Sequence, residues 1–370
     1  PSLVSPGRGF ALLRAEEGPA YWESPKPAVA LQFGMYYVHY VHDCFSILQY
    51  VADNRYVYSR MGSLAGGYAG GDLWRNHVRG QAGGVVVDNL RVTPVDSAEQ
   101  GIRNERLRHR FDSGFKFVAI RAASQADGKA LYPGVDAERA LFLTDEYLFD
   151  VFRLKSDRER QFDWHVNSSG RLAGVDGPPW SDSTDLTADK FWPPQASGPD
   201  MRNVRRRSAG ASAWSETLIQ RGTGEAAAGV HLRMLPCETT ALYAFTPPGC
   251  DPNSAVTLMV RRRAPATVFA ALHEPFKGGA GAIDGFERLA ETSDGLAVAV
   301  AGKAGTAIND RLLLRLGDGV DKPLTLTGAG ESFTFADNAY IRIGAERVVA
   351  GGALTAFRVR VNGSPRAIVN

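Results

Sequence analysis

The sequence predicts an all-β protein, with a large two-layer antiparallel β-sandwich (a supersandwich) followed by a smaller β-sandwich domain. Short runs of β-branched and aromatic residues recur roughly every 10–12 residues, between clusters of Gly, Pro, Asp and Asn. Many runs alternate apolar and polar residues with a period of two, as half-buried strands do, and 311–317 and 357–363 show this most plainly. Convincing helical stretches are scarce.

The predicted strands follow one another with turn signals between them, as in stacked antiparallel sheets. In chain order they lie within 28–41, 45–59, 83–95, 115–122, 139–154, 161–167, 255–263, 267–274, 295–300, 311–317, 324–328, 332–337, 339–344 and 357–363. The best candidate for a helix is the segment 97–110.

Two loop-rich zones interrupt this pattern. Residues 173–203 are dense in Pro, Gly, Asp and Ser, and a long ordered loop of this kind is usually functional. A second, Gly-rich break begins near residue 276 and reads as an inter-domain connection. We therefore expect a large β-sandwich domain over 1–276 and a smaller β-domain over 277–370.

The bulk composition argues against several functional classes. A formal net charge of +2 argues against bulk attraction to nucleic acid or a membrane surface. No apolar run approaches the roughly 18 residues of a membrane span, and no basic and apolar leader opens the chain. Arg greatly outnumbers Lys, and Arg binds carboxylate and sulfate with a planar fork. Codon bias in a GC-rich genome is, however, the commoner cause of such an excess.

The three cysteines lack the spacing of a zinc site. Cys237 and Cys250 flank a short segment that ends in a turn, and they could close a disulfide in an oxidising compartment. Cys44 would be left over as a small buried hydrophobe in an apolar strand.

The part of the chain richest in chemically active side chains lies between residues 36 and 88. It holds Tyr36, Tyr37, His39, Tyr40, His42, Asp43, Tyr56, Tyr58, Arg60, Tyr68, Trp74, Arg75, Asn76, His77, Arg79 and Asp88. Strand alternation places His39 and His42 on opposite faces unless a bulge intervenes. Tyr68 lies between two glycine pairs, which allow close backbone approach to a ligand and expose the phenol. Each residue alone is an ordinary sheet residue, and the clustering is what indicates function.

Several of these stretches, in this order, resemble the central β-sandwich of heparinase II/III-like polysaccharide lyases. The matching stretches are GFALLRAEEGP (9–19), AVALQFG (28–34), HYVHDCFSILQYVADNRYVYSRMG (39–62), GGVVVDN (83–89), 139–172 and TVFAALHEPF (267–276). The resemblance extends over about 1–276. It implies β-elimination on a uronate-containing polysaccharide.

The resemblance also implies which residues act, when it is carried over position by position. Tyr68 falls on the catalytic acid/base, His39 on a residue that neutralises the uronate carboxylate, and His77 is a second imidazole candidate. The residues implied for substrate binding are Arg60, Arg75, Asn76, Trp74 and His42. Trp74, Trp180 and Trp192 could stack on sugar rings, although Trp in a β-sandwich is more often a core residue.

The metal ligands of the family are not carried over. Val41, Arg60 and Ala82 stand where the ligands would be, so we expect neither a metal site nor another cofactor. A slipped register would bring His42 or His77 into play instead.

Members of this family form their cleft between the sandwich and an N-terminal helical (α/α) toroid. The expected partners are therefore an acidic polysaccharide and an upstream helical domain or chain, in a secreted or periplasmic setting, and a homo-oligomer is left open. A non-catalytic carbohydrate-binding or extracellular assembly module derived from the lyase scaffold is the main alternative. A third is a glycoside hydrolase, which needs paired carboxylates. Asp43 and Asp88 are the nearby candidates for that pair, and both look structural.

Overall fold

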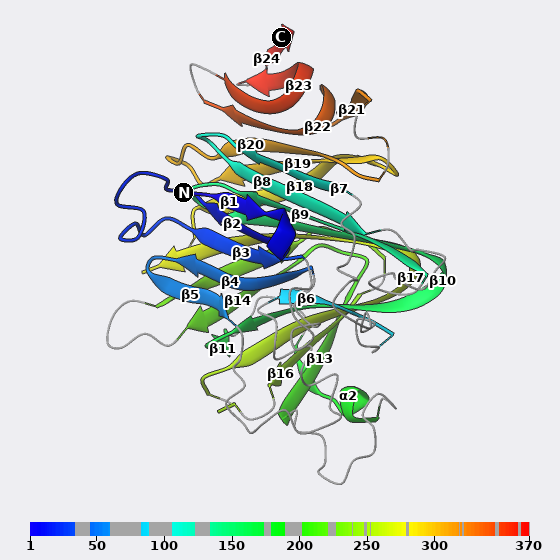
Figure 1. The fold of residues 1–370 in the computed structure, drawn as a ribbon. Helices are drawn as coiled ribbons and strands as arrows, with labels where there is room; N and C mark the ends of the chain where they lie inside the picture. The colour runs from blue at the N-terminus through cyan, green and yellow to red at the C-terminus, as the bar shows by residue number, and fades with distance from the viewer. Residues whose placement is uncertain are drawn as a thin grey trace. The chain divides into compact units, whose positions relative to one another are not determined.

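The computed structural model describes the greater part of the chain. The described residues are 1–33, 45–59, 83–88, 106–122, 134–173, 179–188, 202–220, 227–238, 240–247, 250–251, 253–278, 281–317, 319, 322–344, 348–361 and 364–369. Their regular structure is almost entirely β-strand (Figure 1), which confirms the predicted all-β fold. The helices described are one 3-10 turn, η1 (Pro6–Arg8), and one α-helical turn, α2 (Asp185–Ala188). Neither of these described helices is long and apolar enough to cross a membrane.

The chain divides into two compact units, which are described separately below. The first comprises Pro1–His109 and Lys116–Gly279, and the second comprises Arg110–Phe115 and Ala280–Asn370. The boundary expected after residue 276 lies close to the end of β17 (Val256–Lys277).

The strands of the first unit pair antiparallel with one another wherever a register is described. In chain order they are β1 (Leu3–Ser5), β2 (Phe10–Arg14), β3 (Ala28–Gln32), β4 (Ser46–Ala52), β5 (Arg55–Ser59), β6 (Gly83–Val87), β7 (Arg106–Phe111), β8 (Lys116–Ala122), β9 (Val135–Leu143), β10 (Leu148–Ser168), β11 (Arg171–Leu172), β12 (Ser181–Asp182), β13 (Arg202–Gly210), β14 (Trp214–Gln220), β15 (Ala228–Met234), β16 (Thr240–Thr246) and β17.

Two long strands, β10 and β17, pair with each other on both sides of a central bulge and contribute to both layers of the sandwich. Their register shifts at a bulge between Lys155 and Arg160. Before the bulge, β10 continues through β9 to β8, and its partner half of β17 continues through β15 and β14 to β11. Beyond it, β10 pairs with β6, and the other half of β17 continues through β16 and β13 to β12.

Side chains from these two halves meet in one interior. The rings of Trp164 and Phe269, one from each half, stack with centroids 6.5 Å apart. The Arg262 guanidinium lies 4.5 Å from the centroid of Phe269. Because bulges sharpen the twist and bend of a strand pair, the long ribbon folds over itself, and the predicted sandwich is confirmed.

Strands β1 to β5 form a meander in which each strand pairs with the next. The turn between β4 and β5 consists of Asp53 and Asn54, whose φ angles are 52° and 56°. Two successive positive φ values are typical of a type I′ hairpin turn, and Asp and Asn tolerate that conformation better than most residues. One further pairing joins β4 to the start of β6.

The helix predicted over 97–110 is wrong for its second half. Residues 106–110 belong to strand β7, and 97–105 lie outside the described residues. The Arg108 side chain donates to the Glu138 carboxylate of β9 at 2.8 Å. Backbone hydrogen bonds turn the chain from Asp112 to Phe115 toward β8. Tertiary contacts of this kind override a local helix preference.

No disulfide joins Cys237 and Cys250, both of which are described. The physical reason is their position at opposite ends of β16, a strand of seven residues. At a rise of about 3.3 Å per residue, an extended strand of this length separates the cysteines by far more than the roughly 7 Å that a disulfide tolerates between Cα atoms. Cys44 lies outside the described residues.

The second unit is a smaller sheet that curls around an apolar core. Its strands are β18 (Ile283–Thr292), β19 (Gly295–Gly302), β20 (Asn309–Arg315), β21 (Leu324–Gly328), β22 (Glu331–Ile343), β23 (Val348–Val361) and β24 (Ser364–Val369). They follow the order β18-β19-β20-β22-β23-β24, with β21 on β22. The first half of β22 pairs with β21 and the second half with β20. This long strand therefore links two parts of the sheet, as β10 does in the first unit.

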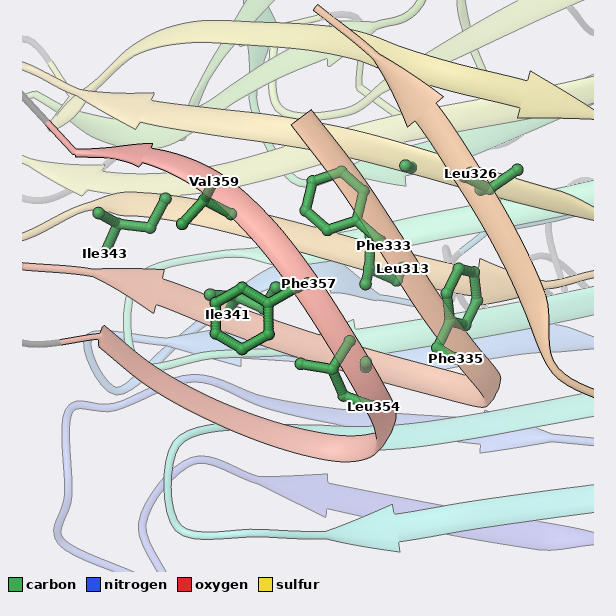
Figure 2. Close-up of a cluster of buried hydrophobic side chains, with 11 residues drawn as sticks. Leu313, Leu326, Phe333, Phe335, Ile341, Ile343, Leu354, Phe357 and Val359 are labelled. Carbon is green, nitrogen blue, oxygen red and sulfur yellow. The ribbon is translucent and has the colours of Figure 1, made fainter. Parts of the chain in front are cut away.

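The core of the second unit contains one large apolar cluster (Figure 2). Its buried members are Ala297, Leu313, Leu326, Phe333, Phe335, Ala339, Ile341, Ile343, Leu354, Phe357 and Val359. They come from β19 to β23, so one cluster holds five strands together through burial of apolar surface.

Candidate functional site

The points where the described chain meets the segments 34–44 and 60–82 lie together at one edge of the β3–β4–β5–β6 sheet. The register pairs that establish this are Gln32 with Ser46, Gln49 with Ser59, and Ile47 with Gly83. The end of β3, the start of β4, the end of β5 and the start of β6 are therefore close neighbours. Both segments begin and end at this edge.

Those two segments carry the residues predicted for catalysis and substrate binding, apart from the possible sugar-stacking residues Trp180, which is described, and Trp192, which lies outside the described residues. His39 and His42 belong to the first segment. The second holds Arg60, Tyr68, Trp74, Arg75, Asn76 and His77. All of these lie outside the described residues, as do Val41, Asp43 and Ala82, so their roles stay predictions. The sheet edge is what the structure adds, because it brings the ends of both segments together.

A buried arginine ties this edge together. Arg139 of β9 is fully buried and donates hydrogen bonds to the carbonyl of Phe45 at 2.5 Å and to that of Gly83 at 3.0 Å. Its guanidinium also makes a two-pronged ion pair with Asp150 of β10, at 2.9 and 2.7 Å. A rigid fork with charge-assisted bonds fixes geometry well. The pair therefore holds the first residues after both segments in place.

Phe45 has a backbone conformation that a large side chain rarely adopts. Its φ angle is 56°, and its side chain is fully buried. A left-handed conformation costs roughly 1–2 kcal/mol for an L-residue other than glycine. The bond from Arg139 to its carbonyl and the stacking of its ring on Phe152, at 6.1 Å, offset that cost. Strain held in place by surrounding contacts often marks a functional position.

A chain of buried polar groups continues from Asp150 into the sandwich. Tyr58 and His273 share a hydrogen bond of 2.8 Å at Nδ1, and Nε2 of His273 lies 4.0 Å from the Asp150 carboxylate. The indole N–H of Trp164 donates to the same carboxylate at 3.3 Å. Burial lowers the pKa of His273 to about 4, against the effect of Asp150, and raises the pKa of Tyr58 well above its usual value. Both groups are therefore neutral at pH 7.

His165 is a second buried imidazole close to the same edge. It lies on β10 opposite Gly84 of β6, one residue along from Gly83. Neither ring nitrogen has a hydrogen-bond partner of good geometry in the described part of the chain. Burial, and then the positive charge of Arg139, lower the pKa of His165 to about 3.

Asp88, a candidate for a hydrolase carboxylate pair, has a structural environment. Its carboxylate accepts a hydrogen bond from the Gln161 backbone N–H at 2.8 Å and pairs with Arg160. Its own backbone N–H donates to the Gln161 carbonyl at 2.8 Å. These contacts give the carboxylate a role in joining β6 to β10. Within the described ranges, no group of three or more His, Cys, Asp or Glu side chains could hold a metal ion.

Sequence reasoning did not single out Arg139, Asp150 or His273. A signal was nevertheless present, because each is an ionisable residue inside an otherwise apolar strand. Such residues are seldom fully buried unless they are paired. An Arg and an Asp 11 residues apart in the single predicted run 139–154 could thus have suggested a buried ion pair.

No family model and no curated protein matches the sequence. Among solved structures, the chain is similar to a chondroitinase AC lyase, at 11% identity and a TM-score of 0.51, over 98% of this chain and 50% of that one. A heparinase III gene product has 11% identity and a TM-score of 0.47, over 85% of this chain and 42% of its own. The heparan sulfate lyase HepC from Pedobacter heparinus has 11% identity and a TM-score of 0.43, over 84% and 41%.

The chain thus spans half the length of the chondroitinase, and less than half the length of each of the other two proteins. At 11% identity, the similarity to the chondroitinase AC lyase concerns the fold alone. The present chain, with two β units and with β10 and β17 shared between layers of the first, therefore has a polysaccharide-lyase-like fold.

Proposed function

We propose that this chain is the β-sandwich portion of a polysaccharide lyase that cleaves uronate-containing polysaccharide by β-elimination. The observation that supports it best is the shared sheet edge, at which both segments with the predicted site residues begin and end. The lyase-like fold provides a scaffold of the right kind. The Arg139–Asp150 pair fixes the position of that edge through the bonds from Arg139 to the carbonyls of Phe45 and Gly83.

The reaction divides into tasks that the predicted residues are chemically suited to perform. His39 stabilises the charge that develops on the uronate carboxylate, helped by the positive potential of Arg60 and Arg75. Tyr68 removes the C5 proton and protonates the departing O4. His77 is the second imidazole available for either task.

The proposal includes a partner for this chain. A helical (α/α) domain or chain supplies the other wall of the cleft, in keeping with the half-length match to the chondroitinase AC lyase. The substrate is an acidic polysaccharide, and the enzyme acts in a secreted or periplasmic setting.

The test is the ultraviolet absorbance of unsaturated uronate products. A panel of uronate polymers is mixed with the chain, alone and with any helix-rich polypeptide that copurifies with it. Tyr68→Phe should lower turnover by roughly 10²-fold or more, because general acid/base catalysis contributes about that factor. His39→Ala should lower it comparably. Tyr56→Phe is the matched control, since this tyrosine is 55% exposed, and its turnover should equal that of the wild type.

Two results would contradict the lyase proposal. One is the absence of unsaturated product from every polymer when the helical partner is present. The other is equal cleavage by the wild type and Tyr68→Phe.

A non-catalytic carbohydrate-binding or assembly module is the second candidate. It is favoured by Val41, Arg60 and Ala82, which replace the metal ligands of the family that the sequence resembles. In that case the wild type binds uronate polymers without forming unsaturated product. His39→Ala would then weaken binding and change no reaction.

A further inference from the structure

An ion pair crosses the interior of the first unit at the β13–β14 side. Nη2 of Arg207 on β13 lies 2.5 Å from Oε1 of Glu216 on β14. The two side chains are 4% and 0% exposed. In the registers that the structure describes, β13 pairs with β12 and β16, whereas β14 pairs with β11 and β15. The pair therefore joins strands of different layers, both labelled in Figure 1.

Two tryptophans flank this ion pair. Trp180 directly precedes β12, where Ser181 pairs with Arg206, so its ring is placed beside Arg207. The Arg207 guanidinium lies 5.4 Å from the Trp180 ring centroid, and Trp180 is half-buried. Trp214 stands two residues before Glu216 on β14. Alternation along a strand puts both side chains on the same face, and Trp214 is 7% exposed.

These side chains have more hydrogen-bonding capacity than the described residues satisfy. Buried atoms without a partner there are Nε and Nη1 of Arg207, Nε1 of Trp180, Nε1 of Trp214 and Oε2 of Glu216. Folded proteins satisfy nearly all such buried groups, with protein, water or a ligand. Indole and guanidinium N–H groups can only donate. The cluster is thus set up to receive a group rich in oxygen acceptors.

The carboxyl group of the cluster is suited to a hydroxyl partner. Burial raises the pKa of Glu216 to about 7, against the opposing effects of Arg207 and Arg205. Near neutral pH this carboxyl can therefore donate to a hydroxyl or accept from it. The guanidinium of Arg207 keeps Nε and Nη1 for a further partner beyond Glu216, and charge-assisted N–H groups of this kind suit a carboxylate.

We propose that Trp180, Arg207, Trp214 and Glu216 form a binding subsite for one sugar unit that carries a carboxylate. The guanidinium and indole N–H groups donate to the carboxylate and hydroxyl oxygens of the sugar. Glu216 bonds a further hydroxyl, and the partly exposed ring of Trp180 stacks on the sugar ring. The sequence already suggests that Trp180 could stack on a sugar ring, whereas Arg207, Trp214 and Glu216 have no part in the lyase reaction above. The subsite does not depend on that reaction.

The test is a titration of the whole chain with free glucuronate and galacturonate, and with glucose for comparison. Binding is followed by tryptophan fluorescence and isothermal calorimetry near neutral pH. We expect saturable binding of at least one uronate, with glucose at least tenfold weaker. Trp214→Phe keeps the ring and loses the N–H, and it should weaken uronate binding about tenfold or more. Trp180→Leu should weaken it by a similar factor through loss of stacking.

Trp22→Phe is the matched control, because Trp22 is 72% exposed and belongs to the β2–β3 connection. It should bind uronate as the wild type does. Arg207→Lys keeps the charge and loses the fork, so it should also weaken binding. Since this residue is buried and paired, circular dichroism checks its fold, and the tryptophan variants carry the test if it unfolds.

Several outcomes would overturn the subsite. They are no saturable uronate binding in the millimolar range, equal affinity of the wild type and Trp214→Phe, or glucose binding as tightly as glucuronate. A structure in high uronate with only ordered water on these donors would do the same. A free monosaccharide has no glycosidic bond to cleave, so this result is independent of the lyase assay.

Discussion

The two units of the chain differ in what they place at the centre of their sheets. In the first, Arg139, Asp150 and His273 are fully buried, and Asp150 contacts Trp164 from the other half of the β10–β17 ribbon. In the second, the central cluster is entirely apolar. Its Asp310–Arg342 pair is on the other face of the sheet, because Leu313 and Ile341 alternate with it and point into the cluster. A second pair, Arg311 with Glu331, is on the face of the cluster, and its Arg311 side chain is 11% exposed.

This difference indicates what the buried charges are for. In the second unit one apolar cluster joins five strands, and its Arg311–Glu331 pair is partly open to water at Arg311. A buried ion pair is a poor source of stability, since desolvation can exceed the Coulombic gain. The Arg139–Asp150 pair is therefore better explained by the geometry it imposes on Phe45 and Gly83 than by stability.

The largest expected difference between the two units is in how acid changes their free energies of unfolding. His165 and His273 have folded pKa values of about 3 and about 4, below the ordinary 6.5. The unfolded chain then binds more protons, so stability falls as the pH drops from about 6.5 to 4, by roughly 3 kcal/mol for each histidine. The raised pKa of Glu216, about 7, has the opposite sign and offsets part of this loss between pH 7 and 4.5.

Urea unfolding at pH 7 and at pH 4.5 measures this effect. All six tryptophans and all seven histidines belong to the first unit, so tryptophan fluorescence follows that unit, and calorimetry follows the second. His165→Gln and His273→Gln should flatten the pH dependence, whereas the exposed His109→Gln should not. Equal stability of the first unit at both pH values would refute this account.

The next largest effect should come from replacing the aspartate of the Arg139–Asp150 pair and that of the Asp310–Arg342 pair. Asp150→Ala leaves the charge of Arg139 fully buried and should cost about 3–5 kcal/mol. Asp310→Ala leaves Arg342, which is 24% exposed and can reach water, so the cost should be about 1–2 kcal/mol. The double variant Arg139→Met with Asp150→Leu should lose less than Asp150→Ala alone. Equal losses from the two aspartate variants, by denaturation of each unit, would contradict the comparison.

A cavity in the apolar cluster should weaken the second unit alone. Leu313 is fully buried there, and Leu313→Ala should cost about 3 kcal/mol through lost burial and the cavity left behind. Calorimetry should show the second transition at a lower temperature and the tryptophan transition unchanged. A matching shift of both transitions would mean that the units unfold together.

The smallest effect concerns two turns with positive φ. Ala329, between β21 and β22, has a φ of 52°, and Asn54 has one of 56°. Ala329→Gly should stabilise the second unit by about 1 kcal/mol, because alanine is strained in this region. Asn54→Gly should stabilise the first unit by only about a few tenths of a kcal/mol, since Asn adopts the left-handed region readily. The order of the two gains, measured as shifts in melting temperature, is the test.

Part of this organisation could be read from local patterns. Turn residues between alternating runs predicted the β-strands. The run 45–59 was expected as one strand, and the structure divides it into β4 and β5 at the Asp53–Asn54 turn. Residues 106–110 could not be read in this way, because their Arg and Leu residues favour a helix locally. Their strand state depends on partners such as Glu138, which is 30 residues away from Arg108.

The sequence by itself determined the all-β class and the concentration of reactive side chains between residues 36 and 88, because period-two alternation and composition are local properties. Only the tertiary structure decided that Arg139 bonds the carbonyls of Phe45, 94 residues away, and Gly83, 56 residues away. It also decided that Arg207 and Glu216 meet across two layers. Strand register and layer packing depend on contacts between distant segments, and no local period of the sequence encodes them.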